Sequence, residues 1–163
     1  MDLLWAPWRL AYVAADKPPA ANDPCFICKF LAEDRDEHNL IVARTPLSVV
    51  LLNRFPYNNG HLLVAPRAHK SHLGDLLPEE MRETMEAMQR MLRTLDGLMR
   101  PDGYNIGLNQ GTAAGAGLPG HLHWHIVPRW NGDTNFMPIL GDTRVIVQSL
   151  DTLRKLLVER VAG

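Results

Sequence analysis

The chain begins with an irregular segment and then changes to short aliphatic runs separated by turn residues such as Thr45-Pro46. Aliphatic runs with tight connections predict antiparallel strands. Another strand is expected after the Pro101-Asp102-Gly103 turn, and the last one precedes a tail that starts near Trp130. The predicted strands are residues 40–43, 48–53, 61–65, 104–109 and 121–129.

Apolar residues repeat at three- and four-residue steps after Pro78, which predicts one long amphipathic helix. Pro78 suits a first turn, and the two glutamates behind it complement the helix dipole. Several stripe residues are methionines, interpreted as core residues because at this spacing gap filling is more common than soft-metal binding. A second helix is expected at about 150–161. The stripe consists of Met81, Met85, Met88, Leu92, Leu95 and Met99.

These elements predict an α+β domain with an antiparallel five-stranded meander sheet, one long helix and one C-terminal helix. The 163 residues, 46% apolar and 21% charged, suit a single domain at 25–163 that includes the tail. Residues 1–24 are predicted to form a Trp- and Pro-rich arm. Packing of Trp5, Trp8 and Arg9 on the domain or on a second subunit is favoured over stacking on an adenine.

The net charge is −1, so nothing global draws the chain to nucleic acid or to an anionic membrane. An anionic ligand must therefore be held locally. No apolar run is long enough to span a bilayer, and the first residues lack the pattern of a secretory signal. Both cysteines fall in one Cys25-Phe-Ile-Cys28 unit rather than in a disulfide framework. We expect a cytoplasmic protein.

The stretch His121-Leu-His123-Trp-His125 carries the clearest chemistry. If it is a strand, its alternation puts three imidazoles on one face and apolar side chains on the other. Such a face suits either three ligands of an open catalytic metal or a nucleophilic imidazole flanked by orienting residues. A cluster of surface histidines is the plainer alternative.

The Gly- and Ala-rich segment 111–120 lies directly before the histidines. Small residues let a backbone approach a ligand and direct N–H groups at phosphate oxygens. A flexible surface loop has the same composition. Next to a histidine face, however, the segment indicates a phosphate cradle beside a nucleophile, with reaction in two steps through a phosphorylated histidine.

The motif His121-Leu-His123-Trp-His125-Ile-Val resembles the histidine-triad (HIT) signature, in which apolar residues alternate with three histidines. The segment 51–66 resembles the nucleotide-binding half of that family. The resemblance covers about residues 25–130 and implies a HIT-like fold. The head Trp5-Ala-Pro-Trp-Arg and the regions 105–117 and 129–136 are similar to a bacterial subgroup associated with diadenosine tetraphosphate (Ap4A) phosphorylase activity.

The resemblance implies roles for four histidines. His123 would attack the α-phosphorus, and His125 would bond to phosphate or leaving-group oxygens. His61 would help to orient the site. His121 is either an orienting residue of the catalytic face or, as in zinc-bearing relatives, a metal ligand.

The same resemblance implies substrate-binding residues. Asn53 would meet the ribose hydroxyls, while Asn109 and the backbone of Gly115, Ala116 and Gly117 would hold the phosphates. Many hydrolases of the family carry Gln where this chain has Gly117, so a side-chain phosphate contact is missing. Arg129 and Arg144 are candidate phosphate contacts or ordinary surface charges.

The Cys25 and Cys28 pair needs two more ligands to close a tetrahedral zinc site. His69 or His72, together with His121, are the candidates, and the resemblance favours His69. Such a site would be structural, because four protein ligands leave no open position for water. The alternatives are two reduced thiols without metal and a redox pair, the latter disfavoured because no thioredoxin-like pattern follows.

The resulting hypothesis is a nucleotidyl-transfer enzyme that cleaves Ap4A with inorganic phosphate to ATP and ADP. The resemblance implies a homodimer, and Mg²⁺ could accompany the substrate. One alternative is a hydrolase of nucleoside polyphosphates or phosphoramidates. The other is a non-catalytic nucleotide-binding module.

Overall fold

The computed structural model describes residues 25–133 and 146–162 of the chain. The predicted arm, with Trp5, Trp8 and Arg9, lies outside the described residues. So does Arg144. No helix among the described residues is long and apolar enough to cross a membrane.

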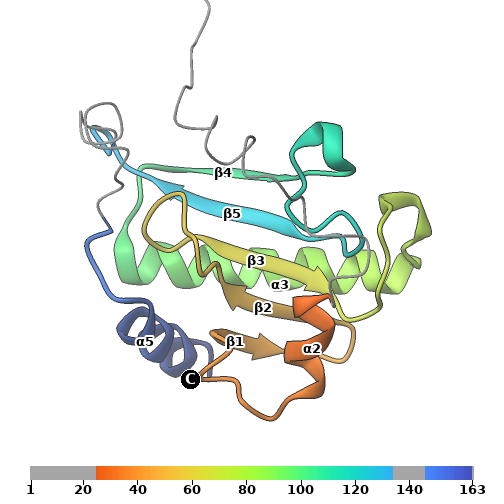
Figure 1. Cartoon of the computed structure of the whole chain (residues 1–163). Helices are drawn as coiled ribbons and strands as arrows, with labels where there is room; N and C mark the ends of the chain where they lie inside the picture. Colours follow the sequence, from red (N-terminus) through yellow and green to blue (C-terminus); the bar gives the residue numbers. More distant parts are fainter. Residues whose placement is uncertain (1–24, 134–145, 163) are drawn as a thin grey trace, which may run out of the picture.

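Five antiparallel strands form one sheet in the order β1-β2-β3-β5-β4 (Figure 1). Their register places Leu63 of β3 opposite His125 of β5 and Gly107 of β4 opposite the same histidine. The strands are β1 (Ile41–Arg44), β2 (Ser48–Leu52), β3 (Leu62–Pro66), β4 (Gly103–Leu108) and β5 (Trp124–Arg129). The predicted five-stranded antiparallel sheet is confirmed.

The strand order departs from a simple meander at one place. The first three strands form a meander, but β5 lies between β3 and β4. The connection from β3 to β4 runs through the long helix α3 (Pro78–Met99), so β4 is not tied to the position beside β3. The connection through α3 places β4 at the edge of the sheet. The shorter connection from β4 to β5 then brings the histidines into the middle of the sheet.

The last predicted strand also starts later than the sequence pattern suggests. It was expected from residue 121 and begins at Trp124. Its pairing with β3 stops at Val64, and β3 ends at Pro66, which has no N–H to donate. The backbone N–H of Leu122 instead donates to the carbonyl of Lys70 at 2.7 Å.

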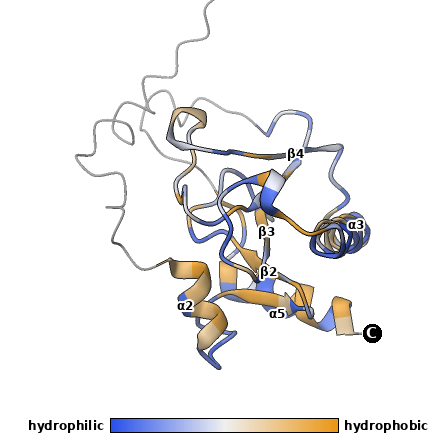
Figure 2. Ribbon diagram, turned by 90° about the vertical axis from the view of Figure 1, so that its right-hand side faces the viewer, coloured by the Kyte–Doolittle hydropathy of each residue, from blue (hydrophilic) through white to orange (hydrophobic). Residues whose placement is uncertain are grey.

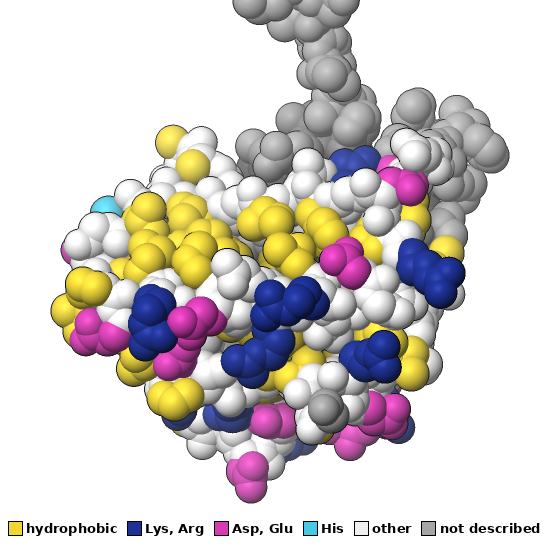
Figure 3. All heavy atoms as spheres, turned by 180° about the vertical axis from the view of Figure 1, so that it is seen from behind, with side chains coloured by type: hydrophobic (Ala, Val, Ile, Leu, Met, Phe, Trp, Pro, Cys, Tyr) yellow, Lys and Arg dark blue, Asp and Glu magenta, His cyan; other side chains and the backbone are white. Residues whose placement is uncertain are grey.

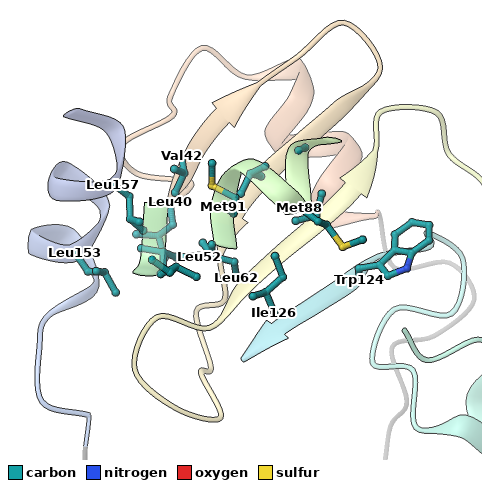
Figure 4. Packing of buried hydrophobic residues seen from close by; sticks show 14 of the residues in the cluster. Leu40, Val42, Leu52, Leu62, Met88, Met91, Trp124, Ile126, Leu153 and Leu157 are labelled. Atoms are coloured by element: carbon teal, nitrogen blue, oxygen red, sulfur yellow. The ribbon is translucent and has the colours of Figure 1, made fainter. Parts of the chain in front are cut away.

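The helix α3 lies across one face of the sheet, and α5 (Leu150–Ala162) packs beside it (Figures 1 and 4). The predicted stripe belongs to this core, with Met88 and Leu95 buried and its other members packed against them. Met91, which was not among the predicted positions, is buried too. The side chain of Arg154 on α5 donates to the carbonyl of Ile41 at 2.7 Å, which fixes α5 at the edge strand β1. From behind, basic and acidic side chains mingle around apolar ones (Figure 3).

A short helix that the sequence pattern did not predict, α2 (Phe26–Ala32), covers part of the opposite face. Figure 2 shows α2 and α3 on opposite sides of the sheet. A second apolar cluster holds α2 in place, through Ile27, Ile41, Val49, Leu51, Leu63 and Ala65. This half-covered face also carries the histidines.

The guanidinium of Arg44 closes the C-terminal end of α2. It donates to the carbonyls of Phe30 at 2.8 Å and Leu31 at 2.9 Å, and it pairs with Asp36 at 2.7 Å. Carbonyls at a helix end have no partner within the helix, so a charged donor supplied from β1 satisfies them.

We predict that Arg44→Ala lowers the free energy of unfolding by about 3 kcal/mol, because it leaves several partly buried acceptors without a donor. Urea denaturation measures this change. The control is Arg82→Ala, which removes an exposed pair with Glu86 and should cost less than about 0.5 kcal/mol. Equal effects of the two substitutions would contradict the role assigned to Arg44.

Candidate active site

Two histidines meet across neighbouring strands. His61 immediately precedes β3, and His125 is the second residue of β5. Nε2 of His61 lies 2.9 Å from Nδ1 of His125. His61 is fully buried, so its ring is held at the level of the sheet. The topology thus joins two imidazoles that are 64 positions apart in the sequence.

The direction of the proton between these rings follows from the other contacts of His61. Its Nδ1 accepts the backbone N–H of Tyr57 at 3.0 Å and faces Nδ2 of Asn53 at 3.2 Å. A nitrogen that accepts a backbone N–H carries no proton of its own. The proton of neutral His61 therefore sits on Nε2 and is donated to His125, whose own proton is left on Nε2.

His123 has the opposite tautomer. Its Nδ1 lies 2.8 Å from the backbone carbonyl of His121, which can only accept, so Nδ1 carries the proton. Nε2 of His123 therefore keeps its lone pair. The rings of His123 and His125 lie edge to face, with centroids 5.0 Å apart. A lone pair and an N–H donor are thus placed side by side.

Burial keeps both rings neutral. His123 is buried, and the resulting desolvation lowers its pKa below 6.5, only partly offset by the bond to the His121 carbonyl. Burial, with a smaller contribution from the nearby His123, lowers the pKa of His125 to about 4. At neutral pH both imidazoles are therefore uncharged, with a lone pair on Nε2 of His123 and an N–H on Nε2 of His125.

His121 points away from this pair, toward the two cysteines. Its Nδ1 lies 3.2 Å from Sγ of Cys25 and 3.5 Å from Sγ of Cys28. Nδ1 of His69 lies 3.3 Å from Sγ of Cys28. The four ligand atoms all lie within 4.8 Å of one another. These separations are close to the roughly 3.5 Å expected between sulfur and nitrogen ligands on one tetrahedral zinc ion.

Protonation also suits a metal here. Nε2 of His121 lies 2.8 Å from the carbonyl of Pro66, so it carries the proton and leaves Nδ1 as a lone pair facing the thiols. Burial, and then the neighbouring Cys25, raise the pKa of the Cys28 thiol to about 11. A metal that binds the thiolates must therefore displace protons. Two thiols and two imidazoles are a donor set that fits zinc.

The structure brings His69, and not His72, to the two cysteines. His69 joins the cluster, whereas the His72 ring bonds to Ser71 at 2.8 Å and lies 3.6 Å from Asp75. The thiol and imidazole group is the one metal-binding cluster found within residues 25–133 and 146–162. No comparable group of carboxylates in those ranges offers a resident site for Mg²⁺.

The predicted phosphate cradle is a compact turn before β5. Gly111 and Gly115 have φ of +83° and +82°, values that favour glycine. Two of the expected donors are used inside the turn, because the N–H of Gly115 bonds to Thr112 and that of Ala116 to Gly111. Among the described residues, no partner is recorded for the N–H of Gly117.

Asn109 and Arg129, two further residues predicted to bind phosphate, lie at different ends of the site region. Nδ2 of Asn109 lies 3.5 Å from the carbonyl of Gly115, at the base of the turn. Arg129 lies at the opposite end of β5 from the histidines, where Asp133 binds it bidentately at 2.6 and 2.8 Å. Its remaining nitrogen donates to Asn105 at 2.8 Å. These bonds connect β5 to β4 and to the start of the tail.

The HIT domain model matches residues 35–132 of this chain. The chain belongs to the HIT family. It is 42% identical over 161 residues to the AP-4-A phosphorylase of Mycobacterium tuberculosis, an alignment that covers 96% of this chain and 83% of that protein.

Two further proteins resemble this chain at lower identity. The bis(5'-adenosyl)-triphosphatase of Saccharomyces cerevisiae is 29% identical over 110 residues, covering 67% of this chain and 50% of that protein. The crystal structure of a Zn-bound histidine triad family protein from Mycobacterium smegmatis has a TM-score of 0.67 and 27% identity. That alignment covers 85% of this chain and 94% of the other. The predicted HIT-like fold is thereby confirmed.

Sequence reasoning missed two contributors to this HIT site. The Pro66 carbonyl fixes the tautomer of His121, and a carbonyl carries no side-chain signal. Tyr57 contacts both His61 and His125 through its ring, with centroids 4.7 and 5.9 Å away. Its only sequence signal was an aromatic residue in a turn otherwise composed of Pro, Asn and Gly.

We predict that His125 titrates with a midpoint near pH 4, because burial disfavours the cation and a proton on Nδ1 would oppose the N–H of His61. NMR of the Cε1–H resonance over a pH series measures this midpoint. Histidines of the urea-unfolded chain, which titrate near 6.5, supply the reference. A His125 midpoint at or above 6.5 would refute the assigned hydrogen bond.

Proposed function

We propose that this protein is a nucleotidyl-transfer enzyme that cleaves Ap4A with inorganic phosphate to ATP and ADP. The observation that carries this proposal is the tautomer of His123. Its Nδ1–H is committed to the His121 carbonyl, so a neutral nitrogen with a lone pair is left as the nucleophile. The 42% identity to a protein named AP-4-A phosphorylase supports the choice of substrate.

In the first step, Nε2 of His123 attacks the α-phosphorus. A P–N bond forms, the P–O bond to the leaving group breaks, and ATP departs with the bonding electron pair. The imidazole becomes positively charged, and the 2.8 Å bond from Nδ1–H to the His121 carbonyl stabilises that charge. Nε2–H of His125 donates to an oxygen that gains charge as the bond breaks.

In the second step, an oxygen of inorganic phosphate attacks the same phosphorus. The P–N bond breaks, His123 recovers its neutral form, and the product is ADP. This acceptor needs donors beside the vacated leaving-group position. We assign this role to the turn before β5, where the N–H of Gly117 is a candidate and Asn109 lies at the base.

We assign the ribose contact to Asn53, which lies beside His61 at the end of β2. Gly115 and Ala116 contribute mainly to the shape of the turn, because their N–H groups are already bonded. We propose that Arg129 holds Asp133 against β5 instead of contacting phosphate, because each of its three guanidinium nitrogens already donates to Asp133 or Asn105. His61 orients His125.

We further propose that Cys25, Cys28, His69 and His121 bind zinc. A zinc ion held by four protein ligands supplies structural stability and takes no part in bond making. The Zn-bound relative from Mycobacterium smegmatis supports this assignment. By fixing His121, the cluster would also fix the carbonyl that orients His123.

We retain a homodimer and a cytoplasmic location as proposals. β4 is an edge strand, with Ile106 47% exposed, and an edge strand offers unpaired backbone groups to a second copy. Apolar side chains gather toward the upper part of the back view, supporting an interface on that side (Figure 3). Any Mg²⁺ would enter with the nucleotide phosphates.

The acceptor is tested by incubating Ap4A with ³²P-labelled phosphate and separating the products. We predict label in ADP, unlabelled ATP, and a turnover rate that rises with phosphate concentration. His123→Ala should abolish turnover while changing nucleotide affinity by less than about tenfold, because the other contacts remain. Quenching the wild-type reaction in alkaline denaturant, which leaves the acid-labile P–N bond intact, should leave nucleotide on the protein.

Each alternative has its own result in this experiment. AMP and ATP formed at a phosphate-independent rate would identify a hydrolase. Cleavage of phosphoramidates without cleavage of Ap4A would identify a hydrolase of nucleoside phosphoramidates. Nucleotide binding without turnover of any of these substrates would identify a binding module.

Metal content is tested with a matched pair of histidine variants. We predict about one zinc per chain in protein purified without added metal, as four ligands of this type would hold. His69→Ala should lose zinc and lower the melting temperature, whereas His72→Ala, three residues away but outside the cluster, should do neither. Elemental analysis and thermal unfolding read the outcome. Wild-type protein that is metal-free and unchanged by added zinc would refute the site.

A further inference from the structure

Tyr57 lies over two of the site histidines, although nothing in the proposed reaction uses it. Its ring is nearly parallel to that of His125, with an interplanar angle of 22°, and it is tilted by 31° from that of His61. The residue is 51% exposed. One aromatic side chain therefore covers both rings of the hydrogen-bonded pair.

The backbone of the same residue controls where the protons sit. The N–H of Tyr57 donates to Nδ1 of His61, which leaves the proton of His61 on Nε2. That proton is shared with Nδ1 of His125 at 2.9 Å, so His125 presents Nε2–H. The backbone N–H of Tyr57, together with the side-chain amide of Asn53 that faces the same nitrogen at 3.2 Å, thus sets the tautomers of two imidazoles in series.

We propose that Tyr57 is a positioning residue for His125, whose ring and backbone N–H together hold the His61–His125 pair in the tautomer that presents an N–H to the leaving group. This inference rests on the proposed function for its consequence in catalysis. The assignment of the tautomers is independent of the proposed function, because it follows from the contacts of the protein alone.

The ring and the backbone act together because Tyr57 lies in the loop between β2 and β3, where no strand pairing holds its N–H. Packing of the ring on the imidazoles supplies that restraint. Without it, the N–H of residue 57 can turn away, and the Asn53 amide at 3.2 Å is then the one described donor that opposes a move of the His61 proton to Nδ1. His125 would then face the leaving group with a lone pair, which repels an anionic oxygen where a donor is needed.

The experiment compares Tyr57→Ala with Tyr57→Phe, and uses Phe55→Ala as a matched control. Phe55 is an aromatic residue of the same loop, 80% exposed, with no recorded ring contact to the histidines. Two readouts are combined: ¹⁵N NMR of the imidazole nitrogens, and kinetics on Ap4A and on adenosine 5′-phosphoramidate. Thermal unfolding confirms that each variant is folded.

For the wild type, we expect ¹⁵N spectra with a protonated Nε2 in both His61 and His125. Tyr57→Ala should give mixed tautomers and lower kcat roughly tenfold to a hundredfold, with KM changed less than about threefold, as for a lost transition-state donor. The loss should be larger for the phosphoramidate, whose amine leaves less readily. Tyr57→Phe and Phe55→Ala should match the wild type in every readout.

A folded Tyr57→Ala variant with unchanged tautomers and unchanged kcat would overturn the proposal. Tyr57→Phe impaired as strongly as Tyr57→Ala would also overturn it, because the hydroxyl and not the ring would then matter. If the wild type turned over neither substrate, the proposed function would fail. The ¹⁵N comparison of wild type, Tyr57→Ala and Tyr57→Phe would still decide whether Tyr57 holds the tautomers.

Discussion

The backbone carbonyl of His121 accepts the Nδ1–H of His123, while the ring of the same residue faces the two cysteines. Its other ring nitrogen donates to the carbonyl of Pro66. Three bonds from one residue thus join β3, the thiol cluster and the ring of His123. Displacement of His121 would change the thiol–imidazole cluster and the orientation of the His123 ring together, so the two groups of side chains cannot vary independently.

The core supports this arrangement from the other side of the sheet. Leu122, Trp124 and Ile126 alternate with the histidines and are buried against α3. Close packing in a protein interior leaves such side chains little freedom to rotate or slide. The imidazoles are therefore fixed by the apolar residues between them as well as by their own hydrogen bonds. Stability and site geometry depend on the same six positions.

Much of this architecture was readable from the sequence, where local pattern and packing agree. The stripe from Met81 to Met99 has a helical period, and the histidines alternate with apolar residues, so the long helix and the last strand were predictable. The helix α2 was missed because it has only seven residues and depends on Arg44, a residue more than ten positions away. Likewise, only the fold reveals that Asp133 binds Arg129 or that His69, and not His72, reaches the thiols.

The strand order also determines when the site can form during folding. β1, β2 and β3 pair through short connections, whereas α3 and β4 lie between β3 and β5 in the sequence. Closing a connection of this length costs chain entropy, and that cost is offset only once the contacts between the paired strands have formed. The His61–His125 hydrogen bond, which spans 64 positions, therefore belongs to the late stage of folding. A partly folded chain could hold a native-like β1–β3 meander while its two halves of the active site are still apart.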